Sequence, residues 1–176
     1  MIKLLISIVA FCLGTSVAIA DIAMQPVVSL QMGAYRNRDE NGSNASLAVE
    51  YRSGDSFTPW TLSPIGGVMF TTVEDWFLFV GLMRHFELNQ SWQWALSFSP
   101  MYYSYSGSGR DLGLALEFRS KIEASYVLPN RARLGIGLSH ISNANLSHYF
   151  GNGKNPGVEI LSLSYTVPIV MNARTR

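Results

Sequence analysis

The feature of this sequence that most limits its fold is a two-residue alternation of apolar and polar side chains. The alternation recurs in segments of about ten residues or more, separated by turn-forming pieces such as "RDENGSN" and "SGSGRD". It is typical of β-strands that meet apolar surroundings on one face, whereas amphipathic helices repeat roughly every 3.6 residues. The pattern predicts eight strands, over 27–37, 44–52, 60–71, 75–87, 92–104, 112–127, 132–142 and 158–169.

The two faces of these strands separate charge from apolar bulk. In 112–126 one face carries Leu112, Leu114, Leu116, Phe118 and Ile122. A soluble sandwich would bury that face, whereas a transmembrane barrel would turn it toward lipid and close on itself, leaving no unpaired sheet edge. Many strands reach the roughly 9–11 residues that cross a bilayer, and tryptophans and tyrosines lie near strand ends, as in interfacial girdles. These features favour the barrel.

We therefore expect an all-β fold, an eight-stranded antiparallel transmembrane β-barrel with a filled polar interior. Eight strands leave a lumen that side chains can fill, so the barrel would not be a pore. The inward positions carry both signs of charge, which pairing would stabilise. They are Glu50, Arg52, Glu117, Arg119, Lys121, Glu123 and Arg133.

The first twenty residues are expected to be a secretory signal peptide and not part of the barrel. Lys3 provides a positive start, residues 4–13 are almost continuously apolar, and Ala18-Ile19-Ala20 fits a cleavage site before Asp21. The apolar run is shorter than the roughly 20 residues that a spanning helix needs. The barrel domain would then comprise residues 21–176.

Composition narrows the classes of function. Without Lys3, 12 basic and 12 acidic side chains remain, and no basic block indicates a nucleic-acid partner. The only cysteine, Cys12, lies in the expected signal peptide, and the chain has three histidines. The sequence therefore indicates neither a metal cluster nor another cofactor.

Three polar residues are expected to share the outward face of two neighbouring strands. The period that places Leu134, Ile136 and Leu138 outward also places His140 and Ser142 outward, and on the next strand Glu159 faces the same way. All three flank the 143–157 connection. Ionisable groups on a lipid face cost up to a few kcal/mol at the midplane and less near the interface, so their shared position indicates a function.

These residue types fit nucleophilic catalysis. Residues two apart on a strand are roughly 6–7 Å apart at the backbone, so His140 could accept the Ser142 proton while Glu159 orients the imidazole. An oxyanion intermediate would need hydrogen-bond donors nearby. The 143–157 connection is rich in amides and flexible backbone, with Asn143, Asn145, Asn152, Asn155, Gly151, Gly153 and Gly157.

This part of the sequence resembles the PagL-type outer-membrane lipid A 3-O-deacylases. The resemblance rests on His140-Ile141-Ser142-Asn143-Ala144 and Asn155-Pro156-Gly157-Val158-Glu159, with "LEFRS" at 116–120 in keeping with it. It implies a barrel with its catalytic triad on the outside wall: His140 as base, Ser142 as nucleophile and Glu159 as orienting acid.

The resemblance also implies an oxyanion hole in the same connection. Asn155 would donate its side-chain amide, assisted by a backbone N–H near Asn145, with Asn143 and Gly157 as further positioning residues. Relatives often carry glycine where this chain has Asn145, and asparagine tolerates the left-handed backbone conformation.

The expected function is hydrolysis of the ester-linked acyl chain at the 3-position of lipid A, by a serine esterase in the outer membrane of a Gram-negative bacterium. The site would lie near the outer leaflet, with lipopolysaccharide as substrate and membrane lipids as surroundings. A homodimer is compatible with the sequence. Two alternatives are a non-enzymatic adhesin or scaffold barrel and a lipid A acyltransferase barrel. Mass spectra of lipid A separate the three: one acyl chain lost, no change, or one gained.

Overall fold

The computed structural model describes residues 25–36, 43–54, 56 and 61–169. The expected signal peptide and Trp60 lie outside these residues. The strands are β1 Val27–Arg36, β2 Ser43–Arg52, β3 Leu62–Thr71, β4 Trp76–Glu87, β5 Trp92–Ser104, β6 Leu116–Val127, β7 Arg133–Ser142 and β8 Val158–Pro168.

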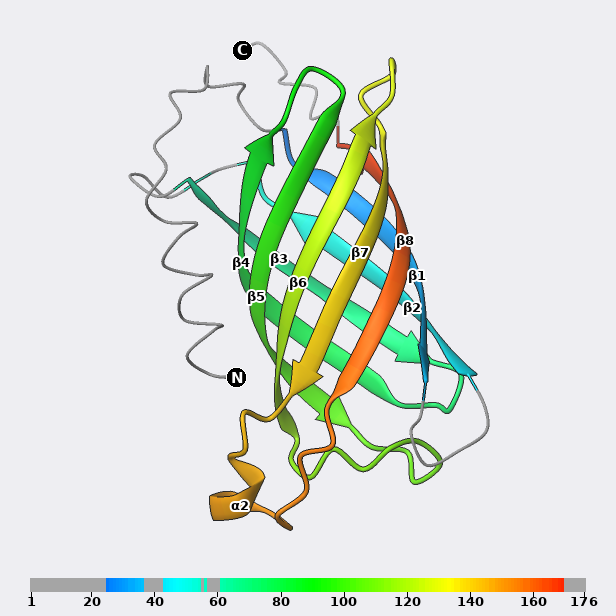
Figure 1. Cartoon of the computed structure of the whole chain (residues 1–176), viewed down its shortest axis with the longest axis vertical. Coiled ribbons are helices and arrows are strands. Elements are labelled where there is room, and N and C mark those ends of the chain that lie inside the picture. Colours follow the sequence, from blue (N-terminus) through cyan, green and yellow to red (C-terminus); the bar gives the residue numbers. More distant parts are fainter. Residues whose placement is uncertain (1–24, 37–42, 55, 57–60, 170–176) are drawn as a thin grey trace, which may run out of the picture.

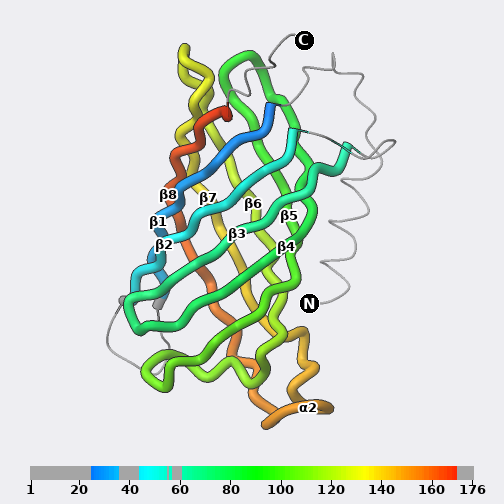
Figure 2. Tube along the Cα trace, turned by 180° about the vertical axis from the view of Figure 1, so that it is seen from behind, coloured from blue at the N-terminus to red at the C-terminus, as the bar shows by residue number. Residues whose placement is uncertain are grey.

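Each strand pairs antiparallel with the next, and β1 also pairs with β8, which closes the sheet into a barrel. The tilted strands and the closed wall are visible from both sides (Figures 1 and 2). Closure gives every strand two neighbours, so the backbone N–H and C=O groups are paired within the sheet. The predicted barrel is confirmed, and the sandwich interpretation is wrong.

One strand begins later than the sequence predicts. The alternation placed residue 112 at the start of a strand with its side chain outward, but β6 begins at Leu116. Gly113 has a φ of 95°, which turns the chain out of the extended conformation. Leu112 is consequently buried, with only 2% of its surface exposed.

The outer wall is apolar along its length. Leu134, Ile136 and Leu138 on β7 are each about half exposed, at 51%, 51% and 52%. Continuous exposed apolar surface of this kind requires lipid around it. Among the described residues, none of the helices combines the length and apolar character that crossing a bilayer takes.

Aromatic pairs mark both ends of this wall. Trp76 and Tyr102, with ring centroids 5.5 Å apart, lie at the end that carries the 143–157 connection. Trp92 and Tyr126, 5.2 Å apart, lie at the opposite end. Such girdles are typical of the two membrane–water interfaces.

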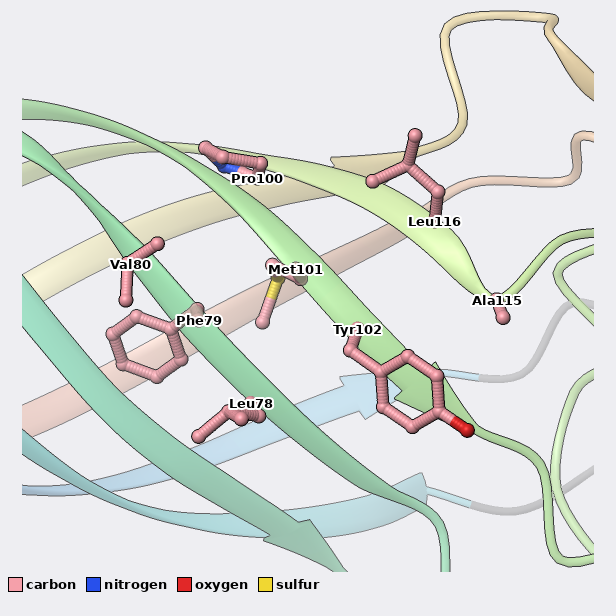
Figure 3. A pocket seen from close by; sticks show the side chains of 8 residues that line it. All are labelled: Leu78, Phe79, Val80, Pro100, Met101, Tyr102, Ala115 and Leu116. Carbon is pink, nitrogen blue, oxygen red and sulfur yellow. The ribbon is translucent and has the colours of Figure 1, made fainter.

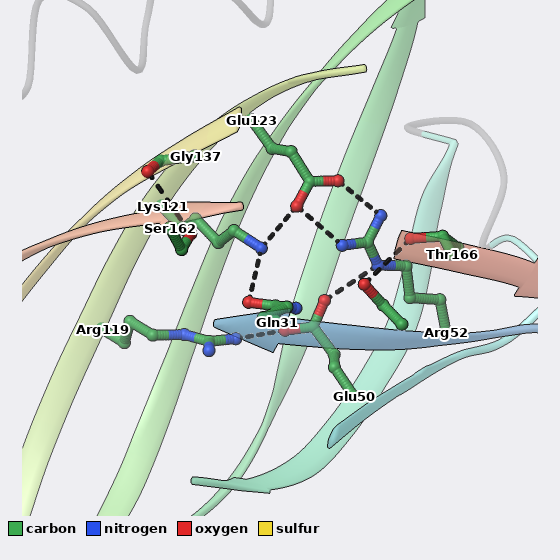
Figure 4. A network of polar contacts seen from close by, with 10 residues as sticks. Gln31, Glu50, Arg52, Arg119, Lys121, Glu123, Gly137, Ser162 and Thr166 are labelled. Carbon is green, nitrogen blue, oxygen red and sulfur yellow. Dashed lines mark hydrogen bonds and ion pairs between the residues drawn. The ribbon is translucent and has the colours of Figure 1, made fainter. Parts of the chain in front are cut away.

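Ion pairs fill the middle of the barrel (Figure 4). Arg52 donates to both Glu123 oxygens, at 2.8 and 3.0 Å, and to Glu50 at 2.8 Å. Arg119 pairs with the other Glu50 oxygen, and Lys121 donates to Glu123 at 2.6 Å. Each buried carboxylate of this network therefore meets two cations, which offsets the cost of removing it from water.

The ion pairs occupy only the middle of the interior, and Glu117, which is also fully buried, lies beside Met101 nearer the 143–157 connection. A cluster of buried apolar residues, including Phe77, Ile141 and Val158, fills the end next to the 143–157 connection. A smaller apolar cluster of Ile65, Met83 and Ala95 lies toward the other end. The expected polar interior is thus confirmed at the level of the ion pairs, with an apolar cluster on either side of them.

Removal of Arg52 should destabilise the barrel strongly. Arg52→Ala leaves the buried Glu50 and Glu123 without their shared cation, and breaking a buried ion pair typically costs about 3–5 kcal/mol. Urea titration of the folded, heat-modifiable form in lipid vesicles measures this free energy of unfolding. Glu87→Ala, at an exposed position at the end of β4, is the control and should change little. Equal stability of the two variants would contradict the role of the network.

Candidate active site

His140 and Glu159 face each other across neighbouring strands. They are direct register partners between β7 and β8, and His140 Nδ1 lies 3.4 Å from Glu159 Oε1. Their side chains are 50% and 67% exposed, so both lie on the outer wall. The carboxylate is therefore placed to orient the imidazole and to stabilise its protonated form.

Ser142 lies two residues further along β7, on the same face as His140. It is partly exposed, and its register partner on β6 is Phe118. Within the described part of the chain, no hydrogen bond joins the Ser142 hydroxyl to His140. Because Nδ1 faces Glu159, Nε2 is the ring nitrogen left for the hydroxyl. Such contacts often become shorter only when substrate binds.

The backbone behind these residues is held by the buried apolar cluster. Ile141 is fully buried, and Val158 is 7% exposed. The two alternate with the outward residues, since Ile141 stands between His140 and Ser142 and Val158 precedes Glu159. They pair directly across the two strands. The outward polar side chains thus stand on a backbone that packing holds in place.

Gly157 closes the site on the side of the loop. Its φ of 64° lies in the left-handed region, and a Cβ at this position would come 3.2 Å from His140 Cε1. Its carbonyl accepts a hydrogen bond of 3.0 Å from Arg110 Nη1. Glycine therefore allows the loop to pass close to the imidazole, and Arg110 holds it there.

Asn143 is a structural residue of the loop. Its side chain is fully buried and donates to the carbonyls of Leu112, at 2.7 Å, and Lys154, at 2.9 Å. Its backbone N–H donates to Asn155 Oδ1 at 3.2 Å. That bond fixes the orientation of the Asn155 amide and leaves its NH₂ group as the free donor.

A tight turn follows Asn143. Ala144 and Asn145 both have positive φ, 53° and 70°, and Leu146 N–H donates to Asn143 C=O at 2.9 Å. Asparagine at position 145 therefore does adopt the left-handed conformation. The turn leads into a short helix, α2 (Ser147–Phe150). α2 was not predicted from the sequence, because four residues are too few for a helical period to appear.

Asp111 connects the 105–115 loop to the 143–157 connection. Its Oδ2 accepts hydrogen bonds from Lys154 Nζ at 2.8 Å and from Asn152 Nδ2 at 3.0 Å. The hydrogen bond from the Lys154 ammonium is the largest cause that lowers the pKa of Asp111 below its ordinary value. Asn152 is thus occupied by this contact. The roles of Arg110, Asp111 and Lys154 were not predicted from the sequence either, because their partners are distant in the chain and form no local motif with them.

An apolar hollow of about 400 Å³ opens on the outer wall of the barrel, the wall that carries His140 and Glu159 (Figure 3). Its lining comes from β4, β5 and the start of β6: Leu78, Phe79, Val80, Pro100, Met101, Tyr102, Ala115 and Leu116. Pro100 has no N–H to donate, and the β4–β5 register is interrupted beside it, between Phe79↔Met101 and Leu82↔Phe98. Pro100 pairs with Phe118, which pairs with Ser142, and the hollow reaches the start of β6, the strand next to the one that carries the serine.

Comparison with known proteins gave a family match and similar structures. A family model described as lipid A 3-O-deacylase (PagL) matches residues 28–168. The crystal structure of the outer membrane enzyme PagL has a TM-score of 0.61 and 23% sequence identity, and the similarity covers 81% of this chain and 99% of that one. A de novo designed transmembrane β-barrel has a TM-score of 0.57 and 12% identity, covering 83% and 96% of the two chains. A search of curated proteins found no match.

The link between the two loops should depend on pH. Because the pKa of Asp111 is lowered, its ionised form and its contact with Lys154 persist at neutral pH and are lost as the pH falls through that lowered pKa. Asp111→Asn should therefore speed hydrogen exchange of the 143–157 backbone at pH 7 by about two- to fivefold, as befits an exposed pair.

Exchange rates corrected for intrinsic chemistry test this expectation, and the two proteins should converge in strong acid. The control is Glu74→Gln, which removes an exposed carboxylate from the turn between β3 and β4 at the same end of the barrel. Equal exchange rates of the 143–157 backbone in the wild type and in Asp111→Asn at pH 7 would show that Asp111 does not hold the loop.

Proposed function

The chain belongs to the PagL family of lipid A 3-O-deacylases, outer-membrane β-barrel hydrolases, and we propose that His140, Ser142 and Glu159 are its catalytic triad. The observation that carries the proposal is the 3.4 Å approach of the His140 imidazole to the Glu159 carboxylate on the lipid-facing wall. Ionisable side chains at that surface are costly, and a catalytic role accounts for their presence.

Acylation would begin at Ser142. His140 Nε2 accepts the hydroxyl proton as Ser142 Oγ attacks the ester carbonyl carbon at the 3-position of lipid A. Glu159 stabilises the imidazolium that forms. Collapse of the tetrahedral intermediate breaks the bond to the sugar oxygen, which takes the proton from His140. The products of this half-reaction are the free 3-hydroxyl group and an acyl-serine.

The oxyanion would be stabilised by the loop. The Asn155 side chain has its Oδ1 engaged by the Asn143 N–H, so its NH₂ group is oriented before substrate arrives. The backbone N–H groups of the turn at Ala144 and Asn145 are the second set of donors. Donors fixed in advance lower the barrier because they need no reorganisation in the transition state.

Deacylation reverses the roles of the same groups. His140 removes a proton from water, the resulting hydroxide attacks the acyl-serine, and Ser142 leaves with the proton returned by the imidazole. The fatty acid is released and the triad is restored. Water is available to the site because His140 and Glu159 stand at the end of the barrel wall, next to the 143–157 connection.

The placement of the site suits a substrate that stays in the membrane. The triad stands at the end of β7 and the start of β8, next to the 143–157 connection, on a wall that is otherwise mostly apolar. Acyl chains can approach sideways from the bilayer without entering the barrel. An acyltransferase that encloses its acyl chain in the lumen is disfavoured, because ion pairs and apolar side chains fill this interior.

Loss of any triad residue should abolish most of the activity in barrels that still fold. We expect Ser142→Ala and His140→Ala to lower the rate by about 10⁴-fold or more. Glu159→Gln should cost less than either, since the carboxylate is exposed and its contact with the imidazole is long. Mass spectrometry of lipid A reads out the loss of one acyl chain. Ser139→Ala, on the same strand but facing inward, is the matched control; a similar loss there, or an active Ser142→Ala, would reject the assignment.

Asn155 should affect the transition state more than substrate binding. Asn155→Ala removes the donor, and loss of one oxyanion donor costs about 10²–10³-fold in kcat. Steady-state kinetics on lipid A in mixed micelles separate kcat from KM, and KM should change little. Asn152→Ala, which removes an amide that contacts Asp111 instead, is the comparison. An Asn155→Ala variant that changes KM alone would exclude the oxyanion role.

A further inference from the structure

Helix α2 presents two aromatic side chains to the surroundings. Tyr149 is 76% exposed and Phe150 is 78% exposed, more than any other large apolar residue of the described chain, including Met32 and Leu163 on the lipid-facing wall at 67%. Leaving such side chains in water forgoes about 1.5–3 kcal/mol for each one that could be buried. Their exposure therefore calls for an apolar surrounding.

Hydrogen bonds of Ser147 with the rest of the 143–157 connection fix the orientation of α2. Ser147 is fully buried, and its hydroxyl donates to the Lys154 carbonyl. The N–H groups of Gly151 and Gly153 both donate to the Ser147 carbonyl at 3.0 Å. The helix thus turns one residue toward the loop and holds the aromatic pair away from it.

The aromatic pair lies at the end of the barrel where an interfacial girdle already stands. Trp76 and Tyr102 form that girdle, and Tyr105 follows β5 at the same end. Figure 1 shows α2 beyond the end of β7, in the connection to β8. Aromatic side chains favour the boundary between headgroups and acyl chains, so α2 continues an existing contact with lipid.

The charge of the connection agrees with such a contact. Residues 143–157 contain one lysine, one histidine and no aspartate or glutamate. No carboxylate of this segment would need to lose its hydration or meet anionic headgroups. The one lysine, Lys154, is paired with Asp111 of the neighbouring loop.

We propose that α2 is an interfacial lipid-binding element that inserts Tyr149 and Phe150 into the outer leaflet, at the boundary between headgroups and acyl chains. This contact would hold the 143–157 connection, and with it Gly157 and Asn155, at a fixed depth beside His140. The inference requires only that the barrel spans the membrane. It does not depend on the triad assignment.

Site-specific fluorescence tests this placement. Cys12 is the only cysteine of the chain, so Cys12→Ala followed by Phe150→Cys gives one site for an environment-sensitive NBD label. The labelled barrel is folded into phosphatidylcholine vesicles, with folding checked by heat modifiability. We expect blue-shifted emission and at least about twofold stronger quenching by lipids with a nitroxide near the headgroup than by aqueous iodide, as for an interfacial aromatic position.

Two reference positions bracket the result. Leu163→Cys on the lipid-facing wall should give the lipid-quenched signal, and Ser108→Cys, exposed in the 105–115 loop, should give the iodide-quenched signal. Tyr149→Cys repeats the measurement in case the Phe150 substitution disturbs the helix. Labels at 149 and 150 that behave like the one at 108 would place α2 in water and overturn the proposal. Inactive triad variants would leave the fluorescence result unchanged.

Discussion

Closure of the sheet is the constraint on which the rest of this molecule depends. In hydrocarbon an unpaired N–H or C=O group costs several kcal/mol, and the β1–β8 pairing removes the last unpaired edge. Closure also fixes which side chains meet inside. The charges of β2 and β6 become neighbours across the lumen, and Arg52 reaches Glu123 although 71 residues separate them. The ion network is thus a consequence of the closed register as much as a support for it.

The same register builds the candidate site. Strand pleating turns every second residue outward, so β7 exposes His140 and Ser142 while it buries Ile141 between them. Antiparallel pairing then places Glu159 directly beside His140. The triad proposed for the outside wall needs no cleft. It needs two neighbouring strands of fixed register and a loop that brings amide donors over their ends, which Asn143, Arg110 and Asp111 hold in position.

Sequence could predict the parts of this structure that follow from local periodicity. Two-residue alternation gave the strands and the outward direction of His140, and turn residues gave the connections. It failed where tertiary contacts override the local pattern. Leu112 turns inward because Gly113, the next residue, has a positive φ and because the Leu112 carbonyl accepts a hydrogen bond from the Asn143 side chain. The contacts of Arg110 with Gly157 and of Asp111 with Lys154 join residues 47 and 43 positions apart. No periodicity reports such contacts.

The layered interior has a consequence for the cell that carries this barrel. Apolar side chains close the lumen next to the 143–157 connection, and interlocked cations and carboxylates close it at mid-depth. Many copies of the protein can therefore reside in an outer membrane without acting as a leak for ions or small solutes. With the proposed site on its outer face, a closed eight-stranded barrel can modify the lipids of the permeability barrier of which it is itself a part.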